Sequence, residues 1–300
     1  MKSKGLTITA IIEAESANYG EGVGNVTSLK KISRDAGRSY TYISRQALRY
    51  NIINQMGVDN TPIDKDGEVL QFSPDASIKD YPEIDLFGYM TTKKPVKTRA
   101  AIARLSNAIA LETFNSDLDF LTNKGLLDRY NDGKKEKDKK DGGNIAQSEI
   151  HKSYYSYTIT VDLDKVGIDK NDDTNIGNEE KADRVNKLLN TIKFLYRDIK
   201  GRRENLSPIF IIGGVYDIKN PFFENRIKCY NNNLNIRAIQ DSISLDDEIK
   251  DNTQVGFIDG IFSNSNDIRA MLNGKSISEF FKKLKESVEA YYRSAGGDNE

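Results

Sequence analysis

The chain has 300 residues, 37% of them hydrophobic and 9% aromatic, which is enough for a folded core and excludes wholesale disorder. The net charge of −1 is an average over opposed blocks, because residues 30–50 carry six basic side chains and one acidic one, whereas 169–183 and 241–251 are acidic. A chain polarised in this way can bind RNA through one surface and proteins through another.

The supply of histidine and cysteine limits the possible chemistry. His151 is the only histidine and Cys229 the only cysteine, so a zinc site is nearly excluded and an internal disulfide is impossible. Asp162 and Asp164 flank Leu163 near a predicted strand end and could hold Mg²⁺, although a solvated strand edge is the commoner explanation. No stretch is long enough to span a bilayer. We therefore expect a cytoplasmic protein with no metal, cofactor or membrane partner.

The first elements are a strand, a glycine-rich loop and a helix. Leu6–Ala14 has the apolar and β-branched composition of a strand, and Asn18–Asn25 contains three glycines. A helix is predicted at Tyr42–Met56, with Ser44 as its N-cap and Gly57 at its end.

The middle of the chain contains two predicted insertions. Three prolines make Val58–Glu83 irregular, and Ile84–Met90 is predicted as a short strand whose Gly88 lets another backbone approach closely. Thr98–Leu111 fits either a strand or a helix, since alanine and leucine favour one and the isoleucine spacing permits the other. The centre of the second insertion, Asn131–Gly143, is highly charged and has no large apolar side chain, so we expect disorder there.

Ser153–Leu163 is the clearest strand, because alternation places large side chains on one of its faces. These side chains are Tyr155, Tyr157, Ile159 and Val161. Aromatic side chains on a sheet can stack on bases. We prefer a buried sheet face, because apolar residues continue the same face.

The remaining elements complete a β-α-β-β-α-β order with one extra candidate strand. An apolar stripe predicts a helix at Lys181–Lys200, and Pro208–Val215 is predicted as a buried strand. Val255–Phe262 is a candidate edge strand, and Ile277–Arg293 is predicted as a terminal amphipathic helix.

The start of the first helix is the main candidate site. A helix N-terminus carries free N–H donors and partial positive charge, which suit a phosphate. Arg45 and Arg49 stand four residues apart and share a face, whereas Leu48 and Ile52 share another. Residues 93–104 add five basic side chains and no acidic one. The alternative is an ordinary amphipathic helix with two solvated arginines.

Four ordered blocks resemble a known family. They are LTITAIIEAESANYGEGVGNVTSLKKISR, YTYISRQALRY, DLFGYM and RLSNAIALETFNSDLDFLTNKG. Together they resemble the DevR-type backbone subunit of type I-B CRISPR effector complexes (Cascade), over about Gly5 to Asn220. The resemblance implies an α+β fold, a modified RRM (ferredoxin-like) palm in one domain over 1–300. It also implies a finger-like insertion at about 57–83, a thumb-like insertion at about 112–150 and a C-terminal helix at about 277–293.

The resemblance further implies a role in antiviral defence. Copies would assemble along a guide RNA and present it for pairing with target DNA. Other partners would be the large subunit, the 5′-handle cap subunit and the guide-processing endoribonuclease. The residues expected to contact RNA are Asn18, Tyr19, Gly22, Gly24, Asn25, Lys30, Lys31, Arg34, Ser44, Arg45, Gln46, Arg49, Lys97, Arg99 and Arg104.

We expect no catalytic residue. Related type III backbone subunits cut RNA with an aspartate in the loop after the first strand. Here Ser16–Ser33 contains no aspartate, and Glu21 is its only acidic residue. The alternatives are a metal-dependent ribonuclease of the type III kind and a protein-interaction scaffold without an RNA role.

Overall fold

The computed structural model describes residues 3–20, 22, 26–92, 96–142 and 145–294. Its largest feature is a mostly antiparallel sheet around β1 (Gly5–Ala14), which lies between β13 (Ser153–Asp162) and β18 (Phe210–Tyr216). The strand order is β22-β21-β18-β1-β13-β10-β4-β3, and β9 also pairs with β13. The outer strands are β3 (Lys31–Arg34), β4 (Arg38–Ile43), β9 (Ala103–Leu105), β10 (Ala108–Ala110), β21 (Gln254–Phe257) and β22 (Lys275–Ser276).

Helices α1 (Arg45–Met56), α4 (Asn178–Lys193) and α8 (Ile277–Ser294) cover one face of this sheet and share a core with it. The alternating large side chains of β13 enter this core, and none of the four is more than 2% exposed. The prediction of a buried sheet face is therefore confirmed. Base stacking on that face is excluded by its burial.

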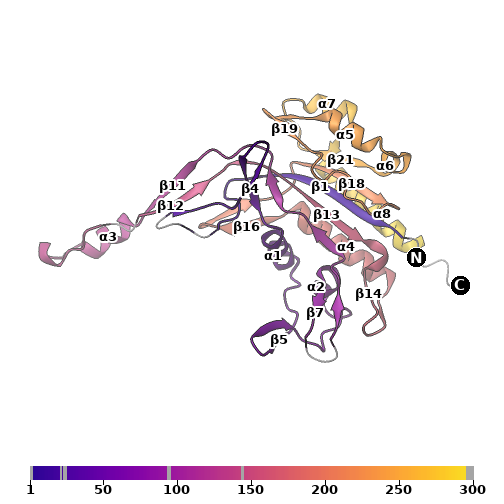
Figure 1. The fold of residues 1–300 in the computed structure, drawn as a ribbon, viewed down its shortest axis with the longest axis horizontal. Coiled ribbons are helices and arrows are strands. Elements are labelled where there is room, and N and C mark those ends of the chain that lie inside the picture. The colour runs from indigo at the N-terminus through magenta and orange to yellow at the C-terminus, as the bar shows by residue number, and fades with distance from the viewer. Residues whose placement is uncertain (1–2, 21, 23–25, 93–95, 143–144, 295–300) are drawn as a thin grey trace.

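A smaller lobe, residues 217–252 and 258–274, packs on the opposite face over β18 and β21 (Figure 1). Its core joins Phe223, Ile239, Phe262 and Ile268 to Phe210 of the sheet. Its elements are β19 (Cys229–Tyr230), β20 (Asn233–Leu234), α5 (Ile236–Ile243), α6 (Asp247–Asn252) and α7 (Ser265–Met271). We predicted none of these, because each is too short to give a periodic pattern.

The predicted strand Ile84–Met90 is wrong. Pro82–Phe87 forms helix α2, and only Tyr89–Met90 (β7) is extended. A proline at the first helical position favours this start, and the apolar residues that follow are all buried rather than alternating. Gly88 has φ 75°, and a Cβ there would lie 2.5 Å from the carbonyl oxygen of Arg99. The close backbone approach predicted for this glycine is confirmed.

Other elements differ from the prediction at their ends. The first helix begins at Arg45 rather than Tyr42, because β4 continues to Ile43 and pairs there with β10. The helix predicted at Lys181–Lys200 ends at Lys193. Tyr196–Ile199 instead pairs with Arg202–Asn205 as a hairpin. The late strand β21 is shorter than predicted and pairs on both sides. The short elements elsewhere are β5 (Ile63–Asp66), β6 (Val69–Phe72), β8 (Thr98–Arg99), β14 (Ile168–Asp169), β15 (Thr174–Asn175), β16 (Tyr196–Ile199) and β17 (Arg202–Asn205).

An arm, residues 115–150, projects from the sheet, with α3 (Lys124–Asn131) near its tip (Figure 1). Strands β11 (Asp117–Thr122) and β12 (Ile145–Ile150) form its stem, and β12 also pairs with β2 (Val26–Thr27). The segment predicted to be disordered, in its described part, continues α3 into a 3₁₀ turn at Glu136–Asp138. None of the residues in α3 or in this turn is buried.

Asp85 of α2 ties the insertion before β8 to the rest of the fold. Its carboxylate is fully buried and accepts hydrogen bonds from Arg99 at 2.6 Å, Arg184 at 2.9 Å and the Gly167 amide at 2.9 Å. Arg184 also donates to the carbonyl oxygens of Ile78 and Lys79. This Asp85 cluster joins α2, β8, the loop before β14 and α4 in one network. Removing its carboxylate would leave the two buried guanidiniums without their shared counter-ion.

Replacing Asp85 with Ala is expected to lower the free energy of unfolding by about 3–5 kcal/mol, because two buried guanidiniums lose their carboxylate. Urea denaturation measures the change. Asp183→Ala, an exposed position on α4, is the matched control and should stay within about 0.5 kcal/mol of the parent. A loss below about 1 kcal/mol for Asp85→Ala would show that the cluster does not hold the insertion.

Shortening Asn131–Gly143 is expected to leave the melting temperature within about 2 °C of the parent, because the described residues there bury no side chain. Thermal unfolding followed by circular dichroism tests this. Loss of soluble expression would mean that the segment is a necessary part of the fold.

Candidate nucleic-acid interface

The start of α1 is held by a network of side-chain hydrogen bonds. Ser44 donates to Asn18 Oδ1 through its amide at 3.1 Å and its hydroxyl at 2.9 Å. The hydroxyl oxygen of Ser44 accepts from the Ala47 amide at 3.2 Å, which confirms the predicted N-cap. The Arg45 amide donates to Asn107 Oδ1 at 2.9 Å. This helix-start network joins the loop after β1, the helix and the loop between β9 and β10.

The network leaves fewer free donors than a bare helix end offers. Of the first three amides, those of Arg45 and Ala47 have side-chain acceptors, whereas Gln46 N–H has none among the described residues. The side chains of Arg45 and Gln46 are both exposed. The side-chain amide nitrogen of Asn107 also lacks an acceptor in the described part of the chain. An anion placed here would meet one backbone amide, one guanidinium and one or two side-chain amides.

Arg49 lies differently from Arg45. Its guanidinium is half-buried over the ring of Phe87, 5.1 Å from the ring centre. Burial lowers the pKa of this guanidinium, and the nearby Glu83 carboxylate partly offsets that effect. Arg49 therefore packs α1 against α2, while Arg45 on the preceding turn faces solvent.

The basic segment 93–104 is largely used within the fold. The side chain of Arg99 is 7% exposed, and its guanidinium donates to Asp85 and to neighbouring carbonyl oxygens within the fold. Arg104 forms an ion pair with Asp162 at 3.1 Å, and Lys97 reaches the carbonyl oxygen of Pro74 at 3.4 Å. Lys93 and Lys94 lie outside the described residues.

The glycine-rich loop and the start of the basic stretch lead to the root of the arm. The hydroxyl of Tyr19 donates to the carbonyl oxygen of Glu149 at 3.1 Å, and Lys31 pairs with the same residue's carboxylate at 2.7 Å. The Lys30 amide donates to the carbonyl oxygen of Asn18 at 2.6 Å. Gly22 is exposed. The two remaining expected residues of the loop, Gly24 and Asn25, lie outside the described residues.

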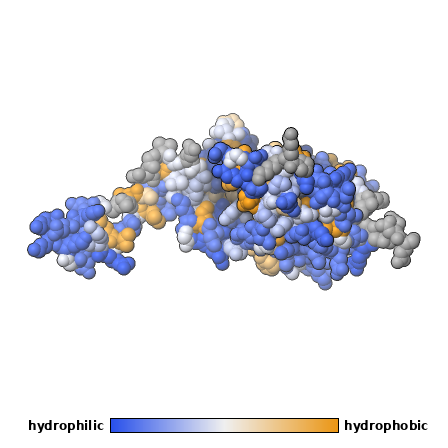
Figure 2. All heavy atoms as spheres, turned by 90° about the horizontal axis from the view of Figure 1, so that it is seen from below, coloured by the Kyte–Doolittle hydropathy of each residue, from blue (hydrophilic) through white to orange (hydrophobic). Residues whose placement is uncertain are grey.

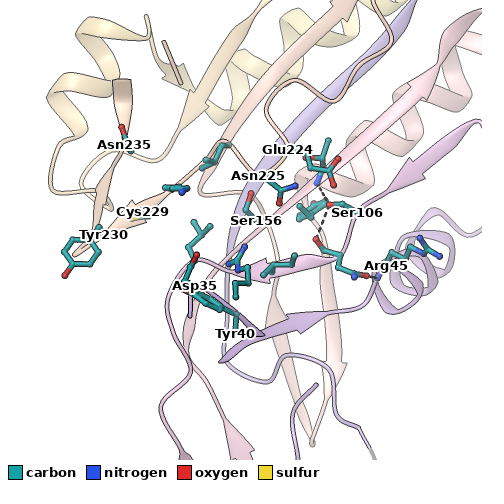
Figure 3. Close-up of a pocket in the computed structure, with 18 of the residues that line it drawn as sticks. Asp35, Tyr40, Arg45, Ser106, Ser156, Glu224, Asn225, Cys229, Tyr230 and Asn235 are labelled. Atoms are coloured by element: carbon teal, nitrogen blue, oxygen red, sulfur yellow. Dashed lines mark hydrogen bonds between the residues drawn. The ribbon is translucent and has the colours of Figure 1, made fainter. Parts of the chain in front are cut away.

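A groove of about 800 Å³ begins beside Arg45 and passes between the sheet and the lobe (Figure 3). Its floor comes from β10 and β13, one wall from the β3–β4 hairpin and the other from residues 224–235 of the lobe. The polar and charged side chains that line it are Arg34, Asp35, Tyr40, Arg45, Ser106, Asn107, Ser156, Thr158, Glu224, Asn225, Lys228, Tyr230, Asn233 and Asn235. This mixture of cations, carboxylates, amides and hydroxyls suits a nucleic-acid strand.

Most of these groove residues escaped the sequence analysis. Arg34 and Arg45 were expected, and Arg34 is held by stacking 4.2 Å from the ring centre of Tyr40 and by donating to the carbonyl oxygen of Ala110 at 3.0 Å. The asparagine side chains were missed because they carry no charge and come from segments far apart in the sequence. The asparagine run 231–233 was the one available signal.

The residues considered for catalysis have structural partners. His151 is buried at the root of the arm, where its Nδ1 lies 2.7 Å from the Thr41 hydroxyl, and burial lowers the pKa of its imidazole. Burial alone would raise the pKa of Asp162, but hydrogen bonds from Arg104 and Lys165 outweigh it and hold that pKa below its ordinary value. Within the described residues, no group of three or more His, Cys, Asp or Glu side chains is placed to hold a metal ion.

Solved structures of similar fold come from CRISPR assemblies. A chain of a CRISPR RNA-guided surveillance complex in a pre-nicking state has a TM-score of 0.57 at 13% identity, covering 90% of this chain and 99% of that one. A chain of a second CRISPR RNA-guided surveillance complex has a TM-score of 0.56 at 15% identity, covering 97% and 99%. The fold is thus that of chains in such complexes. The family model described as CRISPR-associated negative auto-regulator DevR/Csa2 matches residues 6–233, and the chain belongs to this family. No curated protein matches it.

None of the helices in the described residues is both long enough and apolar enough to cross a membrane.

Proposed function

We propose that this protein is a non-catalytic, guide-RNA-binding backbone subunit of a type I-B Cascade complex. The observation that carries the proposal is the groove at the start of α1, in a chain of the DevR/Csa2 family. The core of the sheet fits an RRM-like palm, because β1–α1–β9 and β13–α4–β18 form two crossovers around neighbouring antiparallel strands. The insertion at about 57–83, which carries the β5–β6 hairpin, would be the finger, and the arm would be the thumb.

Guide phosphates would lie at the Arg45 end of the groove. The exposed guanidinium, the Gln46 N–H and the Asn107 amide together offer donors to phosphate oxygens. These groups do not recognise a base, so the guide would be bound without regard to sequence and its bases would remain open to target DNA.

Two exposed apolar patches support assembly of several copies. Leu121 in the arm is 67% exposed, and Leu118, Phe120 and Leu126 are also exposed; Figure 2 shows hydrophobic residues along the arm. The β5–β6 hairpin carries the other patch, with Leu70 72% exposed. The two patches lie on separate projections that point in different directions from the sheet (Figure 1).

Charge favours contact between these two patches. Residues 124–142 of the arm have seven basic and five acidic side chains, whereas residues 63–72 have three acidic and one basic. We propose that the arm of one copy docks on the β5–β6 hairpin of the next. Such a head-to-tail contact uses different surfaces on the two copies and therefore produces an open, extendable row. The large subunit, the cap subunit and the guide-processing endoribonuclease would complete the complex.

Arg45→Ala is expected to weaken binding about equally for unrelated single-stranded RNA sequences. It should also flatten the slope of log K against log salt by roughly 0.7, the effect of losing one phosphate contact on a single strand. Fluorescence anisotropy across a salt series measures both quantities. Lys79→Ala removes one exposed positive charge away from the groove and is the control. If the two variants show equal affinity and slope, Arg45 does not bind phosphate.

No RNA cleavage is expected when guide-loaded protein is incubated with complementary RNA and Mg²⁺ or Mn²⁺. The reasons are the missing aspartate in Ser16–Ser33 and the ion-paired state of Asp162. Gel analysis of labelled target RNA checks this. Cleavage that Glu21→Ala abolishes would support a ribonuclease of the type III kind instead.

A further inference from the structure

Two carboxylates lie in the groove where a polyanion is proposed to bind. Asp35 stands at the turn of the β3–β4 hairpin and Glu224 on the opposite wall, in the lobe (Figure 3). A phosphate near either one would be repelled. The groove therefore holds carboxylate oxygens as well as the Arg45 guanidinium, so a bound strand would have to present donors as well as phosphates.

Neither carboxylate forms an ion pair with a described residue, although the Arg34 guanidinium lies over the ring of Tyr40, the residue that donates to Asp35. Asp35 accepts a hydrogen bond from the Tyr40 hydroxyl at 2.8 Å through one oxygen, which leaves the other oxygen available. The side chain of Glu224 has no hydrogen bond or ion pair among the described residues. By contrast, Ser106 is already used, since its hydroxyl oxygen accepts from the Thr158 amide at 2.9 Å. Neutral oxygens, such as the side-chain oxygens of Asn225 and Ser156, also line the groove, but the two carboxylates are the charged and therefore the stronger acceptors that a bound strand would meet.

These acceptors need donors from the strand. Phosphate oxygens only accept, and a deoxyribose offers no donor, whereas the ribose 2′-hydroxyl donates. We infer that Asp35 and Glu224 accept hydrogen bonds from ribose 2′-hydroxyls of the bound strand, so that the groove selects RNA over DNA. The inference rests on the proposed function and adds the chemical basis on which a guide would be distinguished from single-stranded target DNA.

The bases must be held constant in the test, because base N–H groups can also donate to a carboxylate. Anisotropy titrations of the full chain, freed of co-purified nucleic acid, would use three strands of one sequence: RNA, DNA with deoxyuridine in place of thymidine, and 2′-O-methyl RNA. The wild-type protein is expected to bind RNA at least tenfold more tightly than the other two, which lack the 2′ donor, since a hydrogen bond to a charged group has about that effect.

Glu224→Ala should reduce the RNA-to-DNA affinity ratio about tenfold without weakening DNA binding, because repulsion also falls. Asp35→Ala should act in the same direction, and Asp183→Ala on α4 is the charge-matched control. General damage to the fold would lower RNA and DNA affinity together and is checked by melting temperature. An unchanged ratio in both groove variants, or equal wild-type binding to RNA and DNA, overturns the inference. Binding to neither nucleic acid would contradict the proposed function itself.

Discussion

The groove depends on the helix-start network at α1. Asn18 and Asn107 come from loops far apart in the sequence, and both spend a side-chain oxygen on fixing the same helix end. Their bonds place the exposed Arg45 side chain and the Gln46 N–H at the edge of the sheet. The same bonds occupy the backbone amides of Ser44 and Arg45. The site therefore offers fewer free N–H donors than a bare helix terminus, and those that remain are more precisely positioned.

Arginines in this chain have two different roles, decided by burial. Arg99 and Arg184 are buried around Asp85, where the loss of hydration is offset only by a complete set of acceptors. Arg45 keeps its hydration and remains available to an external anion. The number of basic residues in a stretch of sequence is therefore a poor guide to whether that stretch binds RNA. In the Asp85 cluster, buried ion pairs attach an insertion to the rest of the fold. In the groove, charged side chains and neutral amides together line the proposed RNA-binding surface.

The sequence predicted the long elements better than the site. Ser153–Leu163 and Ile277–Arg293 have periodic patterns several turns or pleats long, and the structure confirms both within a residue at each end. Ile84–Met90 misled us because an apolar run without alternation fits a buried helix as well as a strand. The lobe wall of the groove could not be predicted, because its asparagines share a groove with Arg45 only after the sheet and the lobe have packed. The Ser44 cap was predictable because the Ala47 amide that it accepts from is three residues away, whereas the contributions of Asn18 and Asn107 were not.

Photo-cross-linking is the most direct test of the proposed RNA path. The assembled complex would carry a guide RNA with 4-thiouridine at successive positions, and cross-linked peptides would be identified by mass spectrometry. We expect cross-links in the start of α1, the loop between β9 and β10 and the lobe segment 224–235. Cross-links confined to α4 and α8, on the far side of the sheet, with none in those three segments, would contradict the account.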